Sequence, residues 1–456
     1  MQDSTICAIS TGLTSSGIGI VRISGHKAFS IIKKIFKTKK DIDITEGESH
    51  KAYYGHIISG REVIDEVIVL IMKGPHTYTT EDTVEINCHG GVAVMKKVLD
   101  LVVRSGARIA EPGEFTKRAY LNGRIDLSRA EAVMDLISSK NEMALKNSVK
   151  LLDGGLYEKI RDMRDMILEH TAYIEAALDD PEHYSLDSYG DKILPDVDKI
   201  ISDVDNLLKT FDNGRIITEG IRTVIVGKPN VGKSTLLNIL SGSEKAIVTD
   251  IPGTTRDYLE EEINLDGITL NLVDTAGIRQ ANDEVERIGV ERSFENMESA
   301  DLVIYVVDLS VPLDDNDEKI MSSISGRKSI VLLNKSDLET RINIEYIKAR
   351  FDNILIISAK EHKGTDELKK MIRDMFFNGE LSFNDEICIT NLRQKNLLSD
   401  ALESLHLVRQ SVHDGMPEDF FSIDLLNAYN SLGFIIGESV ESDLIDEIFE
   451  KFCMGK

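Results

Sequence analysis

The pattern of apolar and polar positions changes twice along the chain. Up to about residue 118, short β-branched runs such as Gly19-Ile-Val-Arg-Ile23 and Val67-Ile-Val-Leu-Ile-Met72 alternate with helical stretches, which predicts an α+β unit. From about Leu127 to Leu208, and again after Ile389, the period is that of long amphipathic helices. Neither helical stretch has an obvious end that would complete a separate domain. We therefore infer one helical domain that is split by an insertion.

The insertion begins with a buried strand and a helix of its own. Arg222-Thr-Val-Ile-Val226 is a β-branched apolar run, and Ser234-Thr-Leu-Leu-Asn-Ile-Leu240 is typical of a helix. The predicted fold class is therefore multidomain α+β and α/β, with a split all-α domain. The predicted ranges are 1–118 for the N-terminal domain, 119–215 and 379–456 for the two helical parts, and 216–378 for the insertion.

Composition limits the functional classes. The net charge of −25 argues against a protein that grips nucleic acid over its whole surface. No apolar run is long enough to cross a bilayer, and the N-terminus lacks the pattern of a signal peptide. The four cysteines are scattered, so we expect neither a disulfide framework nor a cysteine zinc site, and we expect a cytoplasmic protein.

Two local groups of basic residues leave open a contact with RNA, although a solvated surface is the preferred interpretation of both. The tighter group comprises Lys33, Lys34, Lys37, Lys39 and Lys40. The looser group comprises Lys96, Lys97, Arg104, Arg108, Lys117, Arg118 and Arg124.

Five motifs follow one another in the insertion, and the first is a phosphate loop. Gly227-Lys-Pro-Asn-Val-Gly-Lys233-Ser234 lies between the predicted strand and helix, where backbone N–H groups and the helix dipole face an anion. We expect Lys233 at the β- and γ-phosphates and the Ser234 hydroxyl on Mg²⁺. The predicted contacts of this loop are Asn230, Val231, Gly232, Lys233, Ser234 and Thr235.

The other four motifs complete a guanine-nucleotide site. Pro252-Gly-Thr-Thr255 offers Thr255 as the second hydroxyl on magnesium, and Asp274, Thr275, Ala276 and Gly277 follow a second predicted strand. Base choice is assigned to Asn334 and Asp337 of Asn334-Lys335-Ser-Asp337, because a carboxylate accepts from both donors of guanine and adenine lacks that pair. Ser358, Ala359 and Lys360 form the last motif. The five motifs together predict that the chain binds GTP.

The sequence pattern leaves alternatives for the residues that would hydrolyse GTP. Ile278 stands where many signalling GTPases carry a water-orienting glutamine, and Arg256 and Arg279 are only nearby candidates for a positive finger. Asn230 is a candidate ligand for a monovalent cation beside the phosphates. Glu286 is a candidate for orienting water. The residues alone favour the alternative that it lies with Asp283 and Glu284 at a helix N-terminus, where the helix dipole favours acidic side chains.

Blocks outside the insertion resemble one family over essentially the whole chain. They are Gly17-Ile-Gly-Ile-Val-Arg-Ile-Ser-Gly25, Tyr78-Thr-Thr-Glu-Asp82, Cys88-His-Gly-Gly91, Glu111 to Ala132, and Phe452-Cys453-Met454-Gly455-Lys456. With the five motifs, the chain is similar to the tRNA uridine 5-carboxymethylaminomethyl-modification GTPases, the MnmE or TrmE family. Two positions depart from the family pattern: the segment Leu178-Asp-Asp-Pro-Glu-His183, and Met454, a volume-conserving change.

The resemblance implies several features that spacing does not. The N-terminal domain would be folate-binding-like and would form a homodimer, with 5-formyltetrahydrofolate or a related tetrahydrofolate held by Arg22, Glu81, Arg124 and Lys456. The insertion would be a Ras-like G domain in which Asn230, Thr249, Ile251 and Thr254 bind potassium, within the nucleotide-contacting run Thr249, Asp250, Ile251, Pro252, Gly253, Thr254 and Thr255. Glu286 would orient water, and Cys453 would take part in the tRNA chemistry, although a packed terminal cysteine is the commoner situation.

The resemblance also implies an activity and a partner. The protein would be a potassium-stimulated GTPase that modifies C5 of the wobble uridine of certain tRNAs. It would act with an FAD- and NADH-dependent MnmG-type protein, in a heterotetramer or larger complex. The alternatives are a ribosome-assembly GTPase, which usually carries an RNA-binding appendage or a second G domain, and a GTP-dependent scaffold switch without enzymatic purpose.

Overall fold

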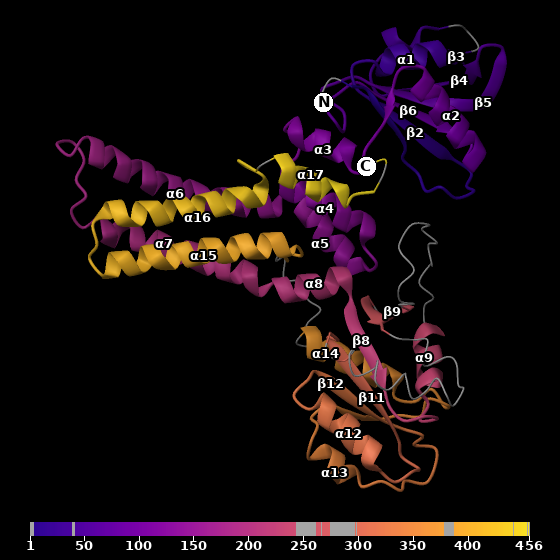
Figure 1. Cartoon of the computed structure of the whole chain (residues 1–456), viewed down its shortest axis with the longest axis vertical. Coiled ribbons are helices and arrows are strands. Elements are labelled where there is room, and N and C mark those ends of the chain that lie inside the picture. The colour runs from indigo at the N-terminus through magenta and orange to yellow at the C-terminus, as the bar shows by residue number, and fades with distance from the viewer. Residues whose placement is uncertain are drawn as a thin grey trace. The chain divides into compact units, whose positions relative to one another are not determined.

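The computed structural model describes most of the 456 residues, namely residues 4–38, 42–242, 261–265, 267–273, 297, 299–377, 387–440, 442–453 and 455. These residues form two compact units (Figure 1). The first contains residues 1–134, 151–196 and 404–456, and the second contains residues 135–150 and 197–403. The four predicted domain ranges stay predictions.

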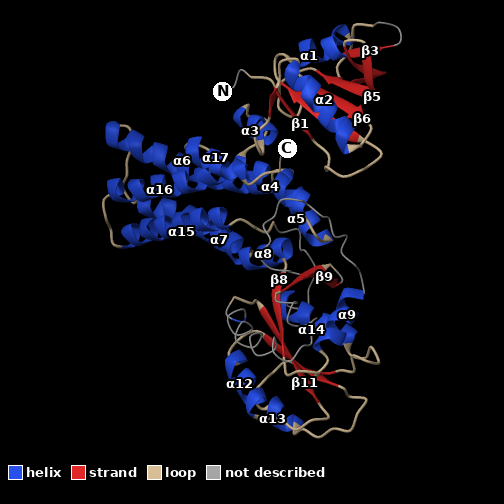
Figure 2. Ribbon diagram, turned by 45° about the vertical axis from the view of Figure 1, so that its right-hand side comes forward, coloured by secondary structure: helices blue, strands red, loops and turns tan. Residues whose placement is uncertain are grey.

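The first unit contains a seven-stranded sheet. Its order is β3(Phe36–Thr38), β4(Lys51–Ser59), β5(Glu62–Met72), β6(Thr83–Cys88), β2(Gly19–Ser24), β1(Ile6–Ile9), β7(Arg108–Ile109). Every pair is antiparallel except β1 with β7. Helices α1(Ala28–Ile35) and α2(Val92–Arg104) cover one face of it (Figure 2), because Val21 and Ile23 of β2 pack against Ile32 and Met95.

The same unit brings the end of the chain to its N-terminal part. Helix α3(Glu114–Leu121) buries Phe115 against Ile6 and Ala8 of β1. Helix α17(Ser442–Glu450) packs Ile445 and Phe449 on Leu127, the first residue of α4(Leu127–Ser138). Beyond α17, the backbone N–H of Gly113 donates to the carbonyl of Cys453 at 3.3 Å, and the Ser10 hydroxyl donates to the carbonyl of Gly455 at 3.2 Å.

Helices flank the insertion on both sides in sequence, as the amphipathic period predicts. They are α5(Glu142–Leu152), α6(Gly155–Asp179), α7(Tyr189–Lys209) and α8(Phe211–Glu219) before it, and α15(Leu392–His413) and α16(Glu418–Ile436) after it. Figures 1 and 2 both show α6 running beside α16. Arg164 of α6, which is 6% exposed, lies 4.0 Å from the ring of Tyr429 and bonds to its carbonyl. Among the described helices, none is long and apolar enough to cross a membrane.

The second unit contains a doubly wound sheet. Its order is β13(Ile354–Ile356), β12(Ser329–Asn334), β11(Leu302–Asp308), β8(Ile221–Val226), β10(Ile268–Leu272), β9(Glu261–Leu265), and all neighbours are parallel except β9 with β10. Helices α9(Lys233–Gly242) and α14(Thr365–Phe377) pack on one face. Helices α12(Asp315–Ile324) and α13(Ile344–Lys348) pack on the other. Strands buried on both faces explain the continuous apolar runs.

Candidate functional site

The carboxyl ends of four parallel strands gather the described motif residues at one edge of the second sheet. The loop 227–232 follows β8, Asp308 ends β11, Asn334 ends β12, and Ser358 follows β13. In open α/β sheets, ligands bind outside the carboxyl ends of the strands. The motifs that are far apart in the sequence therefore share one edge of the sheet.

The phosphate loop depends on two glycines. Gly227 and Gly232 have φ of +150° and +105°, where residues with a Cβ are strained. A Cβ on Gly232 would lie 2.2 Å from Nδ2 of Asn334, and one on Gly227 would lie 2.4 Å from the carbonyl oxygen of Val306. The loop is thus pressed against its neighbours at both ends, and only glycine fits.

Two lysines form polar contacts in and beside the loop. Lys233 Nζ donates to the carbonyls of Gly227 at 2.5 Å and Lys228 at 2.8 Å. Lys228 Nζ lies 3.0 Å from Asp314 and 2.6 Å from Asp317, a buried carboxylate that also accepts from the Tyr305 hydroxyl at 2.8 Å. Burial alone would lower the pKa of Lys228, but the hydrogen bonds to Asp317 and Asp314 outweigh it and leave that pKa raised. The charged form of Lys228 is thereby favoured.

Asn334 joins the phosphate loop to the last motif. Its Nδ2 donates to the carbonyl of Val231 at 2.8 Å, and its Oδ1 accepts from the backbone N–H of Ala359 at 3.0 Å. The side chain is buried, with 2% of the residue exposed. Sequence reasoning assigned this residue to base choice and missed this bridging role, because its partners are 103 and 25 positions away.

Lys335 and Asp337, the charged residues of the motif that begins at Asn334, each have a separate partner. Lys335 Nζ lies 2.6 Å from Asp308. Burial alone would raise the pKa of Asp308, but hydrogen bonds from Lys335 and Ser310 leave it lowered. The Ser358 hydroxyl donates to Asp337 Oδ1 at 2.8 Å and lowers the pKa of that exposed carboxyl. Asp337 is therefore an ionised acceptor with one oxygen fixed by the motif that follows β13.

A substitution at Gly232 tests whether the loop is built for nucleotide. We expect Gly232→Ala to weaken GTP binding at least tenfold, because the new Cβ meets Asn334 and φ is +105°. Gly326→Ala is the matched control, since φ there is +80° but nothing lies within 4 Å of a Cβ. Equilibrium titration with a fluorescent GTP analogue measures both. Equal affinities in the two variants would mean that the contact with Asn334 has no bearing on the ligand.

Many predicted site residues lie outside the part of the chain that the structure describes. They are Thr249, Asp250, Ile251, Pro252, Gly253, Thr254, Thr255, Asp274, Thr275, Ala276, Gly277, Glu286 and Lys456. Of the phosphate loop, Asn230 is exposed and has φ of 59°, and Ser234 and Thr235 lie exposed in the first turn of α9. Lys360 follows Ala359 and is exposed.

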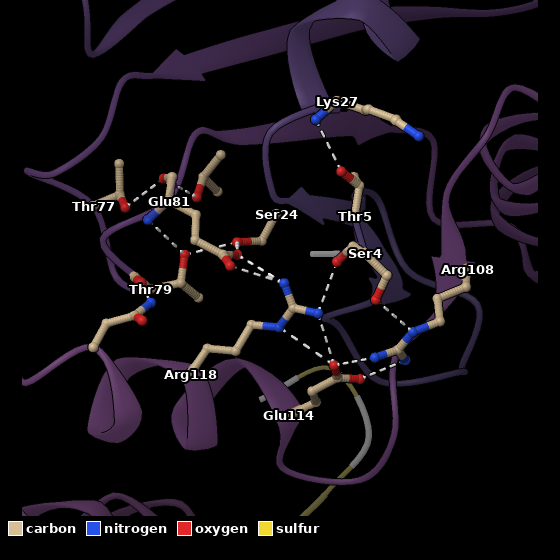
Figure 3. A network of polar contacts seen from close by, with 12 residues as sticks. Ser4, Thr5, Ser24, Lys27, Thr77, Thr79, Glu81, Arg108, Glu114 and Arg118 are labelled. Atoms are coloured by element: carbon tan, nitrogen blue, oxygen red, sulfur yellow. Dashed lines mark hydrogen bonds and ion pairs between the residues drawn. The ribbon is translucent and has the colours of Figure 1, made fainter. Parts of the chain in front are cut away.

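Of the N-terminal candidates, Glu81 lies beside Ser24, the last residue of β2 (Figure 3). Glu81 Oε2 accepts from the hydroxyl of Ser24 at 2.6 Å. Arg22 lies two positions before Ser24 on the same strand face, and its Nη2 lies 2.8 Å from Glu85. The guanidinium of Arg124 donates to the carbonyl of Tyr78 at 3.1 Å and lies 4.9 Å from the centre of the Tyr78 ring.

A buried ion network supports Glu81, and sequence reasoning missed it. Arg118 Nη1 donates to both oxygens of Glu81, at 2.9 and 3.0 Å, while Nη2 donates to Glu114 at 2.9 Å and to the carbonyl of Ser4 at 2.8 Å. Arg108 binds the far side of Glu114 (Figure 3). Hence the interpretation of Arg118 as part of a solvated basic surface is wrong, because only 7% of its side chain is exposed.

The four cysteines differ in how far they are exposed to solvent. Cys7, Cys88 and Cys388 are buried, and burial raises the pKa of Cys7 to about 12 and that of Cys88 to about 11. Cys453 is exposed and carries a free thiol. The alternative of a packed terminal cysteine is therefore wrong, and Cys453 is the accessible thiol of the four.

The fold and the edge of the second sheet define a class of protein. A doubly wound sheet with a phosphate loop after β8, an Asn-Lys-Ser-Asp motif after β12 and Ser358-Ala359-Lys360 after β13 is that of a P-loop GTP-binding protein.

Comparison with known proteins narrows this class to a family. The family model of the GTP-binding protein TrmE N-terminus matches residues 5–124, and that of the MnmE helical domain matches residues 127–453. A tRNA modification GTPase MnmE of Lachnoclostridium phytofermentans is 56% identical over 100% of both chains. One of Acetivibrio thermocellus is 48% identical, again over 100% of both chains. Era of Aquifex aeolicus, solved with GDP and AlF4⁻, is 30% identical over 41% of this chain and 67% of its own, with a TM-score of 0.28.

The chain belongs to the MnmE family of tRNA modification GTPases. The predicted resemblance, the fold class and the enzyme class, a GTP hydrolase of tRNA modification, are thereby confirmed. This membership favours the tRNA-modifying interpretation over the ribosome-assembly GTPase and the scaffold switch.

Proposed function

We propose that this chain is a cytoplasmic, potassium-stimulated GTPase that modifies C5 of the wobble uridine of certain tRNAs as a homodimer. It acts with an FAD- and NADH-dependent MnmG-type partner and adds an aminomethyl or carboxymethylaminomethyl group by means of a tetrahydrofolate one-carbon unit. The observation that carries the proposal is the similarity over 100% of the chain to tRNA modification GTPases. The gathered motifs at the edge of the second sheet support the nucleotide part.

The test of the tRNA part is nucleoside analysis of tRNA from a strain that lacks this protein. We expect the C5-aminomethyl-type wobble nucleosides to disappear and to return when the intact gene is restored. Unchanged levels in the deletion strain would reject the tRNA assignment and would leave the ribosome-assembly GTPase and the scaffold switch as the alternatives.

Magnesium is assigned to Ser234 and Thr255 and potassium to Asn230, Thr249, Ile251 and Thr254. The fit can be judged at the two described positions: Ser234 presents a hydroxyl in the first turn of α9, and Asn230 is exposed in a left-handed conformation that asparagine tolerates. A bound monovalent cation supplies positive charge near the phosphates, where this sequence has no assigned arginine finger. Glu286 is proposed to orient water.

The cation assignment leads to a simple kinetic expectation. We expect GTP turnover to be at least tenfold faster in potassium than in sodium, since loss of a charge-stabilising group costs about 10²–10³ in rate at other enzymes. Asn230→Ala should remove most of this difference. Equal rates of the intact protein in the two salts would reject the potassium assignment while leaving GTP binding intact.

The folate assignment rests on Arg22, Glu81, Arg124 and Lys456, of which the structure describes the first three. Guanidinium groups suit carboxylates of the glutamate tail, and a carboxylate suits the donor edge of a pterin. Glu81 is held by Ser24 and Arg118, and Arg124 is exposed beside Tyr78, so charges of both signs lie around one loop. Cys453 is proposed to take part in the tRNA chemistry.

Binding of 5-formyltetrahydrofolate tests this assignment directly. We expect Glu81→Gln to weaken binding about tenfold or more, because the amide replaces one acceptor by a donor that repels a pterin donor. Calorimetric titration of the full chain measures it, with Glu66→Gln as an exposed control on β5. Unaltered affinity in Glu81→Gln would remove this residue from the folate site.

A further inference from the structure

Both connections between the nucleotide-binding sheet and the helices that flank it in sequence are bonded to one short helix, α5. The chain enters the sheet through α8, which ends at Glu219 just before β8. It returns through residues 387–390, which precede α15. Residues 141–150, which include Asn141 and most of α5, belong to the same compact unit as these two connections.

Asn147 of α5 binds the returning connection. Its Nδ2 donates to the carbonyl of Cys388 at 2.9 Å, and its Oδ1 accepts from the backbone N–H of Cys388 at 3.0 Å. The amide of one side chain thus satisfies both polar groups of one residue, as a neighbouring strand would. With 1% of Asn147 exposed, water does not replace these bonds, and their loss leaves buried groups unpaired.

Asn141, at the start of α5, binds the entering connection and the sheet. Its Nδ2 donates to the carbonyl of Ile217 in α8 at 2.9 Å and lies 3.3 Å from the hydroxyl of Thr269 in β10. Its Oδ1 accepts from the N–H of Ala144 at 2.8 Å and so caps α5. A single side chain therefore touches α5, α8 and β10.

Further contacts tie the two connections to each other. The N–H of Ile389 donates to the Thr210 hydroxyl at 3.2 Å. A Cβ on Gly214 of α8 would lie 2.2 Å from the carbonyl oxygen of Ile389. The two connections are therefore in close contact, and a side chain at position 214 would not fit between them.

Strand β10 is the element through which nucleotide would act on this assembly. It ends at Leu272, two residues before Asp274, the first residue of the motif Asp274-Thr275-Ala276-Gly277 that the sequence predicts to contact the nucleotide. Besides Thr269, its Asn271 donates to the carbonyl of Glu219 in α8 at 2.6 Å. On the neighbouring strand β9, Glu262 pairs with Lys140, which directly precedes Asn141.

We propose that Asn141 and Asn147 are positioning residues that couple the nucleotide state to tRNA modification: they transmit a movement of β10 to α5 and to both connections at once. The proposal deepens the proposed function and rests on its tRNA-modifying activity. Coupling between sites is typically a factor of about 5 to 150, and its demonstration needs a measurement of coupling rather than contacts alone.

Two substitutions separate coupling from folding and catalysis. Asn147→Leu keeps the volume and removes both bonds to Cys388. Asn141→Asp keeps the oxygen that caps α5 and removes the donor to Ile217 and Thr269. Lys146→Ala is the matched control, because its ion pair with Glu142 is exposed on the same helix.

GTP turnover and tRNA modification are measured for each variant in parallel with the parent, in the presence of its partner protein. We expect turnover within about threefold of the parent and modification lowered about 5- to 150-fold for both asparagine variants, with no loss in Lys146→Ala. Equal loss of both activities in a folded variant, or loss of neither, overturns the proposal. Absence of modification by the parent itself would instead reject the proposed function.

If the variants do not fold, hydrogen exchange on the unaltered full chain tests whether the contacts of Asn141 and Asn147 respond to the nucleotide. The amides of Ala144, Cys388 and Ile389 report on the bonds to Asn141, Asn147 and Thr210. We expect their exchange rates to differ at least threefold between the chain saturated with GDP and the chain saturated with a non-hydrolysable GTP analogue. Identical rates in the two states would overturn the proposal, since a merely structural bond does not respond to the nucleotide.

Discussion

Replacement of Asp337 by asparagine is expected to exchange the base preference from guanine to xanthine. The carboxylate accepts from N1–H and the amino group of guanine, whereas xanthine carries a carbonyl in place of that amino group. Because the Ser358 hydroxyl donates to Oδ1 at 2.8 Å, the asparagine oxygen takes that position and its NH2 group takes the other. The NH2 group then faces the guanine amino group donor to donor, but pairs with the xanthine carbonyl.

We expect the affinity for GTP to fall on the order of 10⁴-fold and that for XTP to rise, because a site built for a hydrogen bond rejects an unmatched base by 10⁴–10⁵. Competition between the two nucleotides for the full chain measures the exchange. Asp366→Asn, whose side chain is 94% exposed at the start of α14, should leave the preference for GTP unchanged. Retained preference for GTP in Asp337→Asn would show that another group reads the base.

The candidate nucleotide site at the edge of the second sheet was predictable because each of its motifs is a short continuous segment of the sequence. A β-branched run followed by glycines and a lysine defines strand, loop and helix within about a dozen residues. The parallel sheet then brings the ends of β8, β11, β12 and β13 to one edge. What each side chain does at that edge was less predictable: Asn334 bridges Val231 and Ala359, and only the packed strands set that distance.

The buried polar residues elsewhere could not be found from spacing. Arg118 follows Lys117 in a run that is typical of an exposed helix, yet its partners Glu81 and Ser4 come from segments 37 and 114 positions away. Asn147 lies among polar residues of an amphipathic helix, and its partner Cys388 is 241 positions away. A charge or amide is identified as structural only when its partner is known, and local periodicity does not reveal partners.

Removal of Arg118 is expected to give a large loss of stability. Arg118→Met keeps much of the volume but leaves Glu81 and the buried Glu114 without their shared cation. Breaking a buried pair from one side costs at most about 3–5 kcal/mol, and the cost here is reduced because Arg108 still pairs with Glu114. Hydrogen exchange of the β2 and β6 amides measures the opening of this part of the chain, since a multidomain protein does not unfold in one step. Arg104→Met, at the exposed end of α2, is the control and should change nothing.

The same loss should depend on pH in a defined direction. Burial alone would raise the pKa of Glu114, but hydrogen bonds from Arg108, the Glu111 amide and Arg118 outweigh it and leave that pKa below 4.5. The ionised carboxylate therefore stabilises the fold above about pH 4.5, and the contribution is lost as the pH falls through the lowered pKa. Without Arg118 the pKa of Glu114 should rise, so the difference between parent and variant should be largest near pH 7 and should be smaller at about pH 3, below the ordinary pKa of 4.5. A difference that is the same at both pH values would mean that Arg118 acts through packing of its side chain rather than through its charge.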